Sequence, residues 1–336
     1  MSVAVLYKLL AIFATVAIGW VAGRMRWLGL PVGGTDPSRV VGNSAFFIFV
    51  PALLFRTTAR LDMHTMPWAT VAAFFVPLEV LLLAVYAWQR WRTAAHQAAD
   101  VDEAERAAAV PAARAIAVCF GNSVQVGIPM AAALFGEAGL GIHVALVSLH
   151  ALILLSTVTL LVELDVARAR AVHEVSASLW RTMHKTLRNT VVHPVTLPVL
   201  AGLAWNATGW PVPGALDETL QLLGTAVAPV CLVLIGLSLA YTGIGGAVGS
   251  GLAIAGLKLV ALPALVLAVA HWGFGLAGMP LHVVVLMAAM PTGSNALIFA
   301  QRYRAHEAEA TASIVLGTVG FVLTAPAWLA VLARTS

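Results

Sequence analysis

Long apolar segments alternate with short charged or Gly/Pro-rich connections along the chain. A helix needs about 20 mostly apolar residues to cross the hydrocarbon core of a bilayer. Ten segments meet this condition, at residues 3–23, 38–58, 67–88, 112–135, 139–163, 189–209, 216–240, 248–271, 280–301 and 311–333. The first is too long for the apolar region of a typical signal peptide, so we expect a retained span. The pattern predicts an all-α polytopic membrane protein with ten transmembrane helices.

The composition agrees with a membrane protein and excludes several other classes. Of the 336 residues, 60% are hydrophobic and only 10% are charged, whereas soluble domains carry about 25% charged residues. The net charge of +4 is too weak and too scattered for a nucleic-acid-binding surface. Cys119 and Cys231 both lie in apolar runs, where a small buried side chain is the expected role. We therefore expect no metal, no cofactor and no nucleic-acid partner.

Sequence motifs for catalysis are also missing. The chain contains no P-loop, no GxSxG and no HExxH, because Ala177 and Ala310 stand where a second zinc-binding histidine would be needed. Neither ATP-driven transport nor an intramembrane hydrolase is indicated. The sequence predicts a protein that is not an enzyme.

The distribution of Lys and Arg predicts the orientation of the chain. Positive residues accumulate in cytoplasmic connections, and the ten-span pattern places fourteen of them on one side and three on the other. This asymmetry puts both termini outside. The abundance of Arg and Ala is typical of a GC-rich bacterial genome, so we expect the cytoplasmic membrane of a bacterium.

The ten spans divide into two halves of five, residues 1–164 and 189–336. An odd number of spans in each half forces the halves into opposite orientations if they share a fold. Corresponding spans carry Pro51 and Pro229, and the next pair carries Glu79 and Lys258. Inverted repeats are therefore predicted.

The connection between the halves, residues 165–188, has apolar residues at helical spacing between basic ones. These apolar residues are Val172, Val175, Leu179, Met183 and Leu187. The pattern favours a cytoplasmic interfacial helix, and a solvated loop is the alternative.

Two spans, the fourth and the ninth, are interrupted at mid-length by polar residues, glycine and proline. Residues 121–129 read GNSVQVGIP, and residues 290–295 read MPTGSN. Unpaired backbone groups cost several kcal/mol each in lipid, so both interruptions must face protein or water. Pro129 and Pro291 are well placed to begin second half-helices. Ordinary proline kinks sealed by Ser and Asn remain the alternative.

Half-helices that begin at mid-membrane present their N–H groups and partial positive charge to a ligand. Such ends bind anions, although unwound carbonyls can instead hold a cation. Neutral polar side chains and the special backbone positions around the interruptions are the substrate-binding candidates. These are Asn122, Ser123, Gln125, Gly127, Pro129, Pro291, Thr292, Ser294 and Asn295.

Ionisable residues within spans are costly and are candidates for coupling or charge balance. Glu79 and Lys258 are the first pair, with helix packing as the alternative role for each. His143 and His150 lie seven residues apart on one helix face, where packing histidines are favoured over a proton relay.

At the two interruptions the sequence resembles the auxin efflux carrier family, the PIN-like group that includes bacterial organic-anion permeases. The motifs are GNSVQVGIP at residues 121–129 and MPTGSNA at residues 290–296, supported by VPALLF at 50–55, Lys258 and AQRY at 300–303. The resemblance implies ten helices in inverted repeats, with helices 4 and 9 broken and crossing and substrate bound beside the crossing. It also implies elevator-style movement of one bundle against a scaffold, and dimers are common among related folds. His193-Pro194 departs from the Asn-Pro expected there, so His193 is a further candidate for coupling.

These features predict a secondary transporter, an efflux carrier or permease, for a small organic anion such as a carboxylate. Moving a monoanion out of the cell at about 100 mV releases roughly 2.3 kcal/mol, so the membrane potential alone suffices for efflux. A sodium-coupled symporter of the bile-acid type and a membrane receptor that does not transport are the alternatives.

Overall fold

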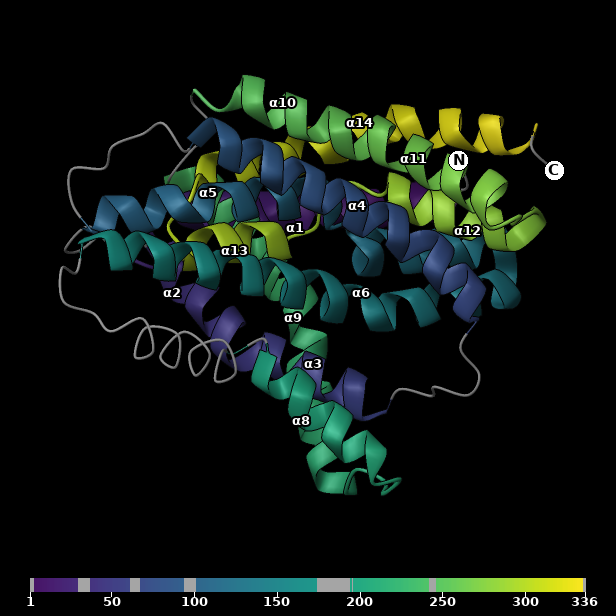
Figure 1. Ribbon diagram of the computed structural model, residues 1–336, viewed down its shortest axis with the longest axis horizontal. Helices are drawn as coiled ribbons and strands as arrows, with labels where there is room; N and C mark the ends of the chain where they lie inside the picture. The colour runs from purple at the N-terminus through teal and green to yellow at the C-terminus, as the bar shows by residue number, and fades with distance from the viewer. Residues whose placement is uncertain are drawn as a thin grey trace.

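The computed structural model describes residues 3–29, 37–60, 67–93, 101–173, 194, 196–241 and 246–334. Every regular element in these ranges is helical (Figure 1). The α-helices are α1 Val3–Arg24, α2 Pro37–Ser44, α3 Val50–Ala59, α4 Trp68–Thr93, α5 Val101–Cys119, α6 Ile128–His173, α8 Thr196–Ala207, α9 Gly214–Tyr241, α10 Val248–Gly256, α11 Leu262–Ala268, α12 Gly278–Ala289, α13 Asn295–Arg302 and α14 Glu307–Leu332. Four π-helical turns join them, η1 Ala45–Phe49, η2 Ser123–Gly127, η3 Leu257–Ala261 and η4 Val269–Gly273.

Three of the π-helical turns precede a proline. η1, η2 and η3 each end two residues before a proline, namely Pro51, Pro129 and Pro263. Proline lacks an N–H and its ring collides with the carbonyl four residues earlier, and a wider turn relieves both problems. The chain therefore continues as one long helix from α2 through α3 and from α10 through α11.

Six helices in the described ranges are long and apolar enough to cross a bilayer. They are Pro37–Ala59, Trp68–Arg92, Ala138–Ala169, Gly214–Tyr241, Val248–Gly273 and Glu307–Leu332. Each overlaps one of the ten predicted segments, and the prediction that these segments are helical is confirmed. The total of ten spans and the inverted repeats stay predictions. α6 continues to His173, beyond the predicted end of the first half at residue 164, and most of the predicted interfacial helix lies outside the described residues.

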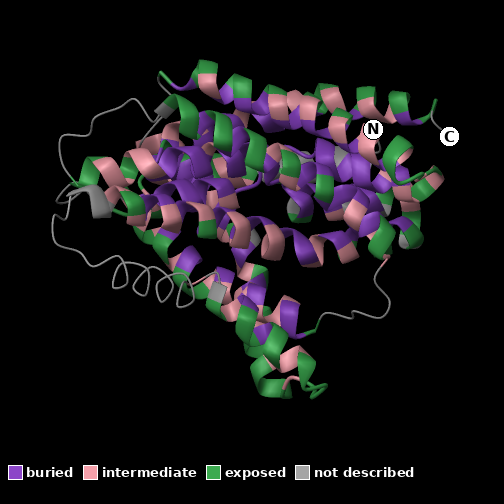
Figure 2. Cartoon of the chain, in the orientation of Figure 1, coloured by how far each residue is buried: buried purple, intermediate pink, exposed green. Residues whose placement is uncertain are grey.

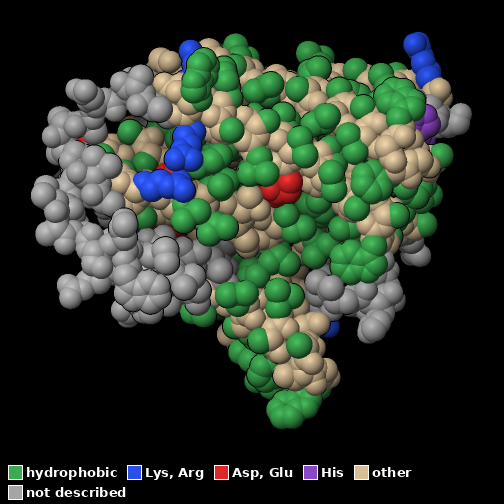
Figure 3. All heavy atoms as spheres, viewed as in Figure 1, with side chains coloured by type: hydrophobic (Ala, Val, Ile, Leu, Met, Phe, Trp, Pro, Cys, Tyr) green, Lys and Arg blue, Asp and Glu red, His purple; other side chains and the backbone are tan. Residues whose placement is uncertain are grey.

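The surface fits contact with lipid. On the face shown in Figure 3, hydrophobic side chains cover much of the described surface, and Lys or Arg side chains appear at the left and at the upper right. Val76, Val80 and Leu83 of α4 are among the exposed apolar residues. In water such a surface would favour association, whereas hydrocarbon solvates it.

The helices pack in two groups. α1 lies along α9, and α3 packs against both α8 and α9. The second group contains α4, α5, α6, α10, α11, α12 and α14, with α5 between α4 and α6 and with α12 against α4, α6, α11 and α14. In Figure 1, α3 and α8 project below α6, away from α10 and α14. Burial is concentrated in the second group, around α5 and α12, whereas α8 is largely exposed (Figure 2).

Glycines allow α1 and α9 to approach closely. A Cβ atom at Gly236 would overlap the backbone oxygen of Val16, and one at Gly19 would overlap the backbone of Val233. We expect Gly236→Ala to lower the free energy of unfolding by about 1–3 kcal/mol, since overpacking forces the helices apart. Thermal unfolding in detergent measures this effect.

The matched control for this prediction is Gly256→Ala. Gly256 is exposed on α10, and no atom lies within 4 Å of its added Cβ. Alanine is the better helix former, so this variant should unfold at the wild-type temperature or slightly above it. Equal melting temperatures for both variants would show that the α1–α9 contact is not tight.

Candidate functional site

Two short non-helical segments lie side by side in the interior. The first, Phe120–Asn122, follows α5, and the second, Met290–Ser294, follows α12. The Asn122 N–H donates to the Pro291 oxygen at 2.8 Å, and the Gly293 N–H donates to the Phe120 oxygen at 2.8 Å. An antiparallel bridge thus forms between Gly121 and Thr292. Backbone N–H and C=O groups lose their helical partners where a helix ends. Each segment supplies hydrogen-bond partners for such groups of the other segment.

Glycine makes this pairing possible. A Cβ at Gly293 would lie 2.9 Å from the Gly121 oxygen and 3.0 Å from Cδ1 of Phe120. A Cβ at Gly121 would lie 3.2 Å from Nζ of Lys258. The two backbones therefore meet at a distance that larger residues do not allow.

The Lys258 side chain caps the C-terminal end of α12. It is 1% exposed, and its Nζ donates to the Ala288 oxygen at 2.7 Å. A cation suits this position because the C-terminal carbonyls of a helix carry partial negative charge. Lys258 thus compensates the carbonyl end of the helix that leads into the second segment.

Glu79 occupies a separate position on α4. The Thr157 side chain hydrogen-bonds its carboxyl group, and Oε1 has no hydrogen-bond partner among the described residues. No ion pair joins Glu79 to Lys258 in the part of the chain that the structure describes. The two predicted coupling residues therefore do not form a pair.

Two histidines of α6 support the turn that follows the first segment. Nε2 of His143 lies 2.8 Å from the Ser123 backbone oxygen, and Nδ1 of His150 lies 3.5 Å from Oγ of Ser123. The His150 ring also packs on Phe120, with centroids 4.5 Å apart. A Cβ at Gly127 would lie 2.6 Å from Nε2 of His143, so Gly127 makes room for this histidine. These contacts favour the packing role for the pair.

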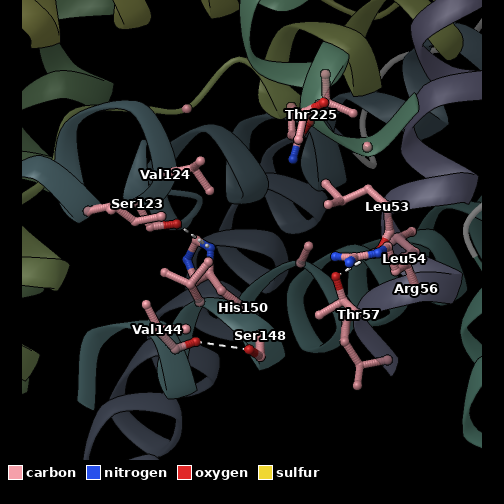
Figure 4. Close-up of a pocket in the computed structure, with 18 of the residues that line it drawn as sticks. Leu53, Leu54, Arg56, Thr57, Ser123, Val124, Val144, Ser148, His150 and Thr225 are labelled. Carbon is pink, nitrogen blue, oxygen red and sulfur yellow. Dashed lines mark hydrogen bonds between the residues drawn. The ribbon is translucent and has the colours of Figure 1, made fainter. Parts of the chain in front are cut away.

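A cavity of about 380 Å³ lies beside the paired segments. This volume is in the range of about 300–1,000 Å³ that is usual for small-molecule sites. Figure 4 shows Ser123 and His150 on one side of the cavity and Leu53, Arg56 and Thr57 on the other. Much of the remaining wall is apolar. The cavity can therefore enclose a small molecule between two polar sides.

A second, smaller cavity lies between α1, α9 and α14. Its volume is about 270 Å³, and most of its lining residues are apolar, Trp20 and Ile235 among them. Asn122 contributes to the walls of both cavities. This residue thus stands between the two spaces beside the first segment.

Comparison with known proteins identifies the family. The family model described as "Membrane transport protein" matches residues 4–329. The chain belongs to this family of membrane transporters, which includes the auxin efflux carriers. Family membership confirms the predicted resemblance and indicates transport rather than catalysis as the general activity.

Plant and bacterial relatives are similar to this membrane transport protein over different lengths. "Auxin efflux carrier component 8" of Arabidopsis thaliana is 25% identical over 58% of this chain and 64% of its own length. "Probable auxin efflux carrier component 5a" of rice is 22% identical over 88% of each chain. "Putative malonate transporter" of Rhizobium meliloti is 28% identical over 41% of this chain and 43% of its own length. The match thus spans less than two thirds of the Arabidopsis and Rhizobium proteins.

In this family member, the predicted site residues that the structure describes fall into three groups. Some line the larger cavity, some pair the two segments, and some lie outside the cavity lining. Asn122, Ser123, Ser294, Asn295 and His150 line the larger cavity. Pro291 and Thr292 pair the segments instead, and the buried Thr292 hydroxyl donates to the Ala117 oxygen at 2.9 Å. Gly127, Glu79 and Lys258 are outside the cavity lining. The side chains of Gln125 and Pro129 and the whole of His193 lie outside the described residues.

Sequence reasoning missed the opposite wall of the cavity. Arg56 of α3 lines it, together with Gln221 and Thr225 of α9. The sequence signal for Arg56 was its position inside the predicted span 38–58, where a charge is costly. Its contact with α9, about 160 residues away, carries no local signature. Both cysteines are free and buried, as predicted, and the described ranges hold no cluster of three metal-ligating side chains.

Proposed function

We propose that this protein is a secondary transporter that moves a small organic anion across the bacterial cytoplasmic membrane and binds it where the fourth and ninth predicted spans break and cross. The observation that carries the proposal is the cavity of about 380 Å³ beside the two paired segments. η2 begins at Ser123 and α13 begins at Asn295, and both residues line this cavity. Two helix starts thus place partial positive charge beside one cavity.

The other residues that line the cavity suit an anion with an apolar carbon skeleton. Asn122 and Asn295 supply amide donors, whereas Leu53, Val124 and Val144 supply apolar surface. Neutral donors orient a carboxylate without the cost of burying a further charge. The name of the Rhizobium relative refers to malonate, a dicarboxylate, which is consistent with this substrate class.

We further propose ten spans in two inverted repeats, with both termini outside, and elevator-style movement of the second helix group against the first. The tight glycine contact between α1 and α9 supports a rigid scaffold that contains α1, α3, α8 and α9. The larger cavity is lined by α3 and α9 on one side and by α6 and the paired segments on the other, so relative movement of the groups would change its access. A homodimer stays a prediction from the family resemblance.

Counterflow in proteoliposomes tests the substrate class. A panel of monocarboxylates and dicarboxylates should exchange across the vesicle membrane, and a neutral or cationic solute should not. Parallel measurements with and without sodium distinguish this activity from a sodium-coupled symporter. Transport of a neutral or cationic solute alone would overturn the proposal, and binding without counterflow would favour a receptor.

Asn122→Ala is expected to raise the KM for the transported carboxylate about tenfold or more. Hydrogen bonds to charged groups contribute about 1.5–3 kcal/mol, which corresponds to this factor. The amount of folded protein in the membrane should stay at the wild-type level. Transport kinetics in vesicles of equal protein content provide the measurement.

Asn206→Ala is the matched control for this variant. Its side-chain amide bonds the Ala59 oxygen at 3.0 Å, at the end of α8 and outside the cavity lining. The control should keep the wild-type KM. An unchanged KM in Asn122→Ala would remove Asn122 from substrate recognition.

A further inference from the structure

A charged group stands across the larger cavity from the paired segments. Figure 4 shows Arg56 on one side and Ser123 and His150 on the other. The Arg56 guanidinium binds Asp217 of α9 through two hydrogen bonds, of 2.9 and 3.2 Å. Its Nη2 also donates to Oε1 of Gln221 at 2.9 Å. The guanidinium that borders the cavity thus already holds a carboxylate in a two-point contact.

The cluster carries more positive than negative charge. Arg60 also binds Asp217, with Nη1 at 2.8 Å from Oδ2, so two guanidinium groups share one carboxylate. Glu218, the next carboxylate on α9, is exposed. Arg56 is 26% exposed and Asp217 is 18% exposed, so the pair is only partly accessible to solvent. An anion that enters the cavity therefore meets a partly buried guanidinium whose carboxylate partner is shared with a second arginine.

We propose that Arg56 is a second anion-binding residue of the cavity and that a substrate carboxylate competes with Asp217 for its guanidinium. The inference rests on the proposed transport of organic anions and specifies the substrate class as small molecules with an acidic group at each end. One end meets Asn122, Ser123 and the start of α13, and the other end meets Arg56. The substrate's own length, rather than its charge alone, then determines recognition.

A substrate carboxylate can replace the Asp217 carboxylate at Arg56 without leaving a charged group unpaired. The guanidinium fork matches any carboxylate in the same two-point geometry. Asp217 does not become an unpaired anion when it is displaced, because Arg60 remains bound to it. The apolar part of the cavity lining, which includes Val124, Val144 and Val227, suits the carbon chain between the acidic groups.

Selectivity of counterflow in proteoliposomes tests this proposal, with acetate and propionate against malonate, succinate and glutarate. Arg56→Gln should raise the KM for the preferred dicarboxylate at least tenfold and change the KM for monocarboxylates less than twofold. Arg56→Lys keeps the positive charge but loses the two-point hydrogen bonding of the guanidinium. Its KM for the preferred dicarboxylate should therefore lie between that of wild type and that of Arg56→Gln. Asp217→Asn removes the competing carboxylate and should lower the KM for dicarboxylates several-fold.

Arg114→Gln is the matched control. It removes an ion pair of similar geometry, with Arg114 Nη2 at 2.7 Å from Oε1 of Glu309, away from the cavity. This variant should keep wild-type selectivity.

The outcomes distinguish failure of the proposed transport function from failure of the proposed role of Arg56. If wild-type protein exchanges no carboxylate, the proposed function fails and this inference fails with it. If wild-type protein exchanges carboxylates but Arg56→Gln impairs both classes equally, Arg56 is a structural residue and the inference alone is overturned. Should Arg56→Gln fail to fold, Asp217→Asn decides: an unchanged or higher KM for dicarboxylates overturns the exchange of carboxylates.

Discussion

Gly293→Ala should abolish counterflow and lower the free energy of unfolding by about 1–3 kcal/mol. The added methyl group would lie 2.9 Å from the Gly121 oxygen and 3.0 Å from the Phe120 ring, closer than ordinary van der Waals contact. Relief requires the two segments to separate, which lengthens the 2.8 Å bond from the Gly293 N–H to the Phe120 oxygen. Because both segments border the larger cavity, separation also displaces the proposed substrate-binding groups. Thermal unfolding and counterflow of the same preparation measure the two effects.

Gly317→Ala is the control for this variant. Gly317 lies on α14 beside the second segment, and its added Cβ would lie 3.8 Å from Pro291, Thr292 and Ala255, an ordinary contact distance. We expect near-wild-type stability and transport. Normal counterflow in Gly293→Ala would show that close pairing of the segments is not required for transport.

Lys258→Met should reduce transport more than tenfold while leaving the protein folded. Lys258 is almost fully buried, and its Nζ is 2.7 Å from the Ala288 oxygen at the end of α12. Methionine fills a similar volume and removes a charge that is costly to bury, so thermal stability should change little. The carbonyl end of α12 then loses its cation, and the positive charge close to Gly121 disappears. Transport kinetics and thermal unfolding, measured together, test both expectations.

Trp328→Phe provides a neutral comparison for the same region. Nε1 of Trp328 donates to the Leu259 oxygen at 2.8 Å, so this variant also removes a side-chain donor from a backbone carbonyl. It removes no charge and does not reach the paired segments, and we expect transport close to wild type. Equal loss of transport in both variants would assign Lys258 to packing rather than to charge compensation.

Local patterns in the sequence predicted the class of protein and part of the lining of the larger cavity. Hydropathy along residues 67–88 or 311–333 reports a lipid-sized helix without reference to any other segment. Polar and glycine-rich interruptions at 121–129 and 290–295 similarly mark positions where helices end. Asn122, Ser123, Ser294 and Asn295 were found in this way, and all four line the larger cavity.

Roles that depend on distant partners could not be predicted. Thr292 was a candidate for binding substrate, but its hydroxyl bonds the Ala117 oxygen, which is 175 residues earlier in the chain. Arg56 was not among the predicted site residues, although it lines the cavity and binds Asp217. A residue type and its immediate neighbours do not reveal which of two faces packs against another helix.

The amino-acid sequence by itself determined that this protein is helical, membrane-embedded and a member of a transporter family, because hydrophobic length and short motifs are local properties. Only the tertiary structure decided that Phe120–Asn122 pairs with Met290–Ser294 and that Arg56 faces the same cavity as Ser123. Backbone groups released from two helix ends must find partners, and in the folded chain they find them in each other.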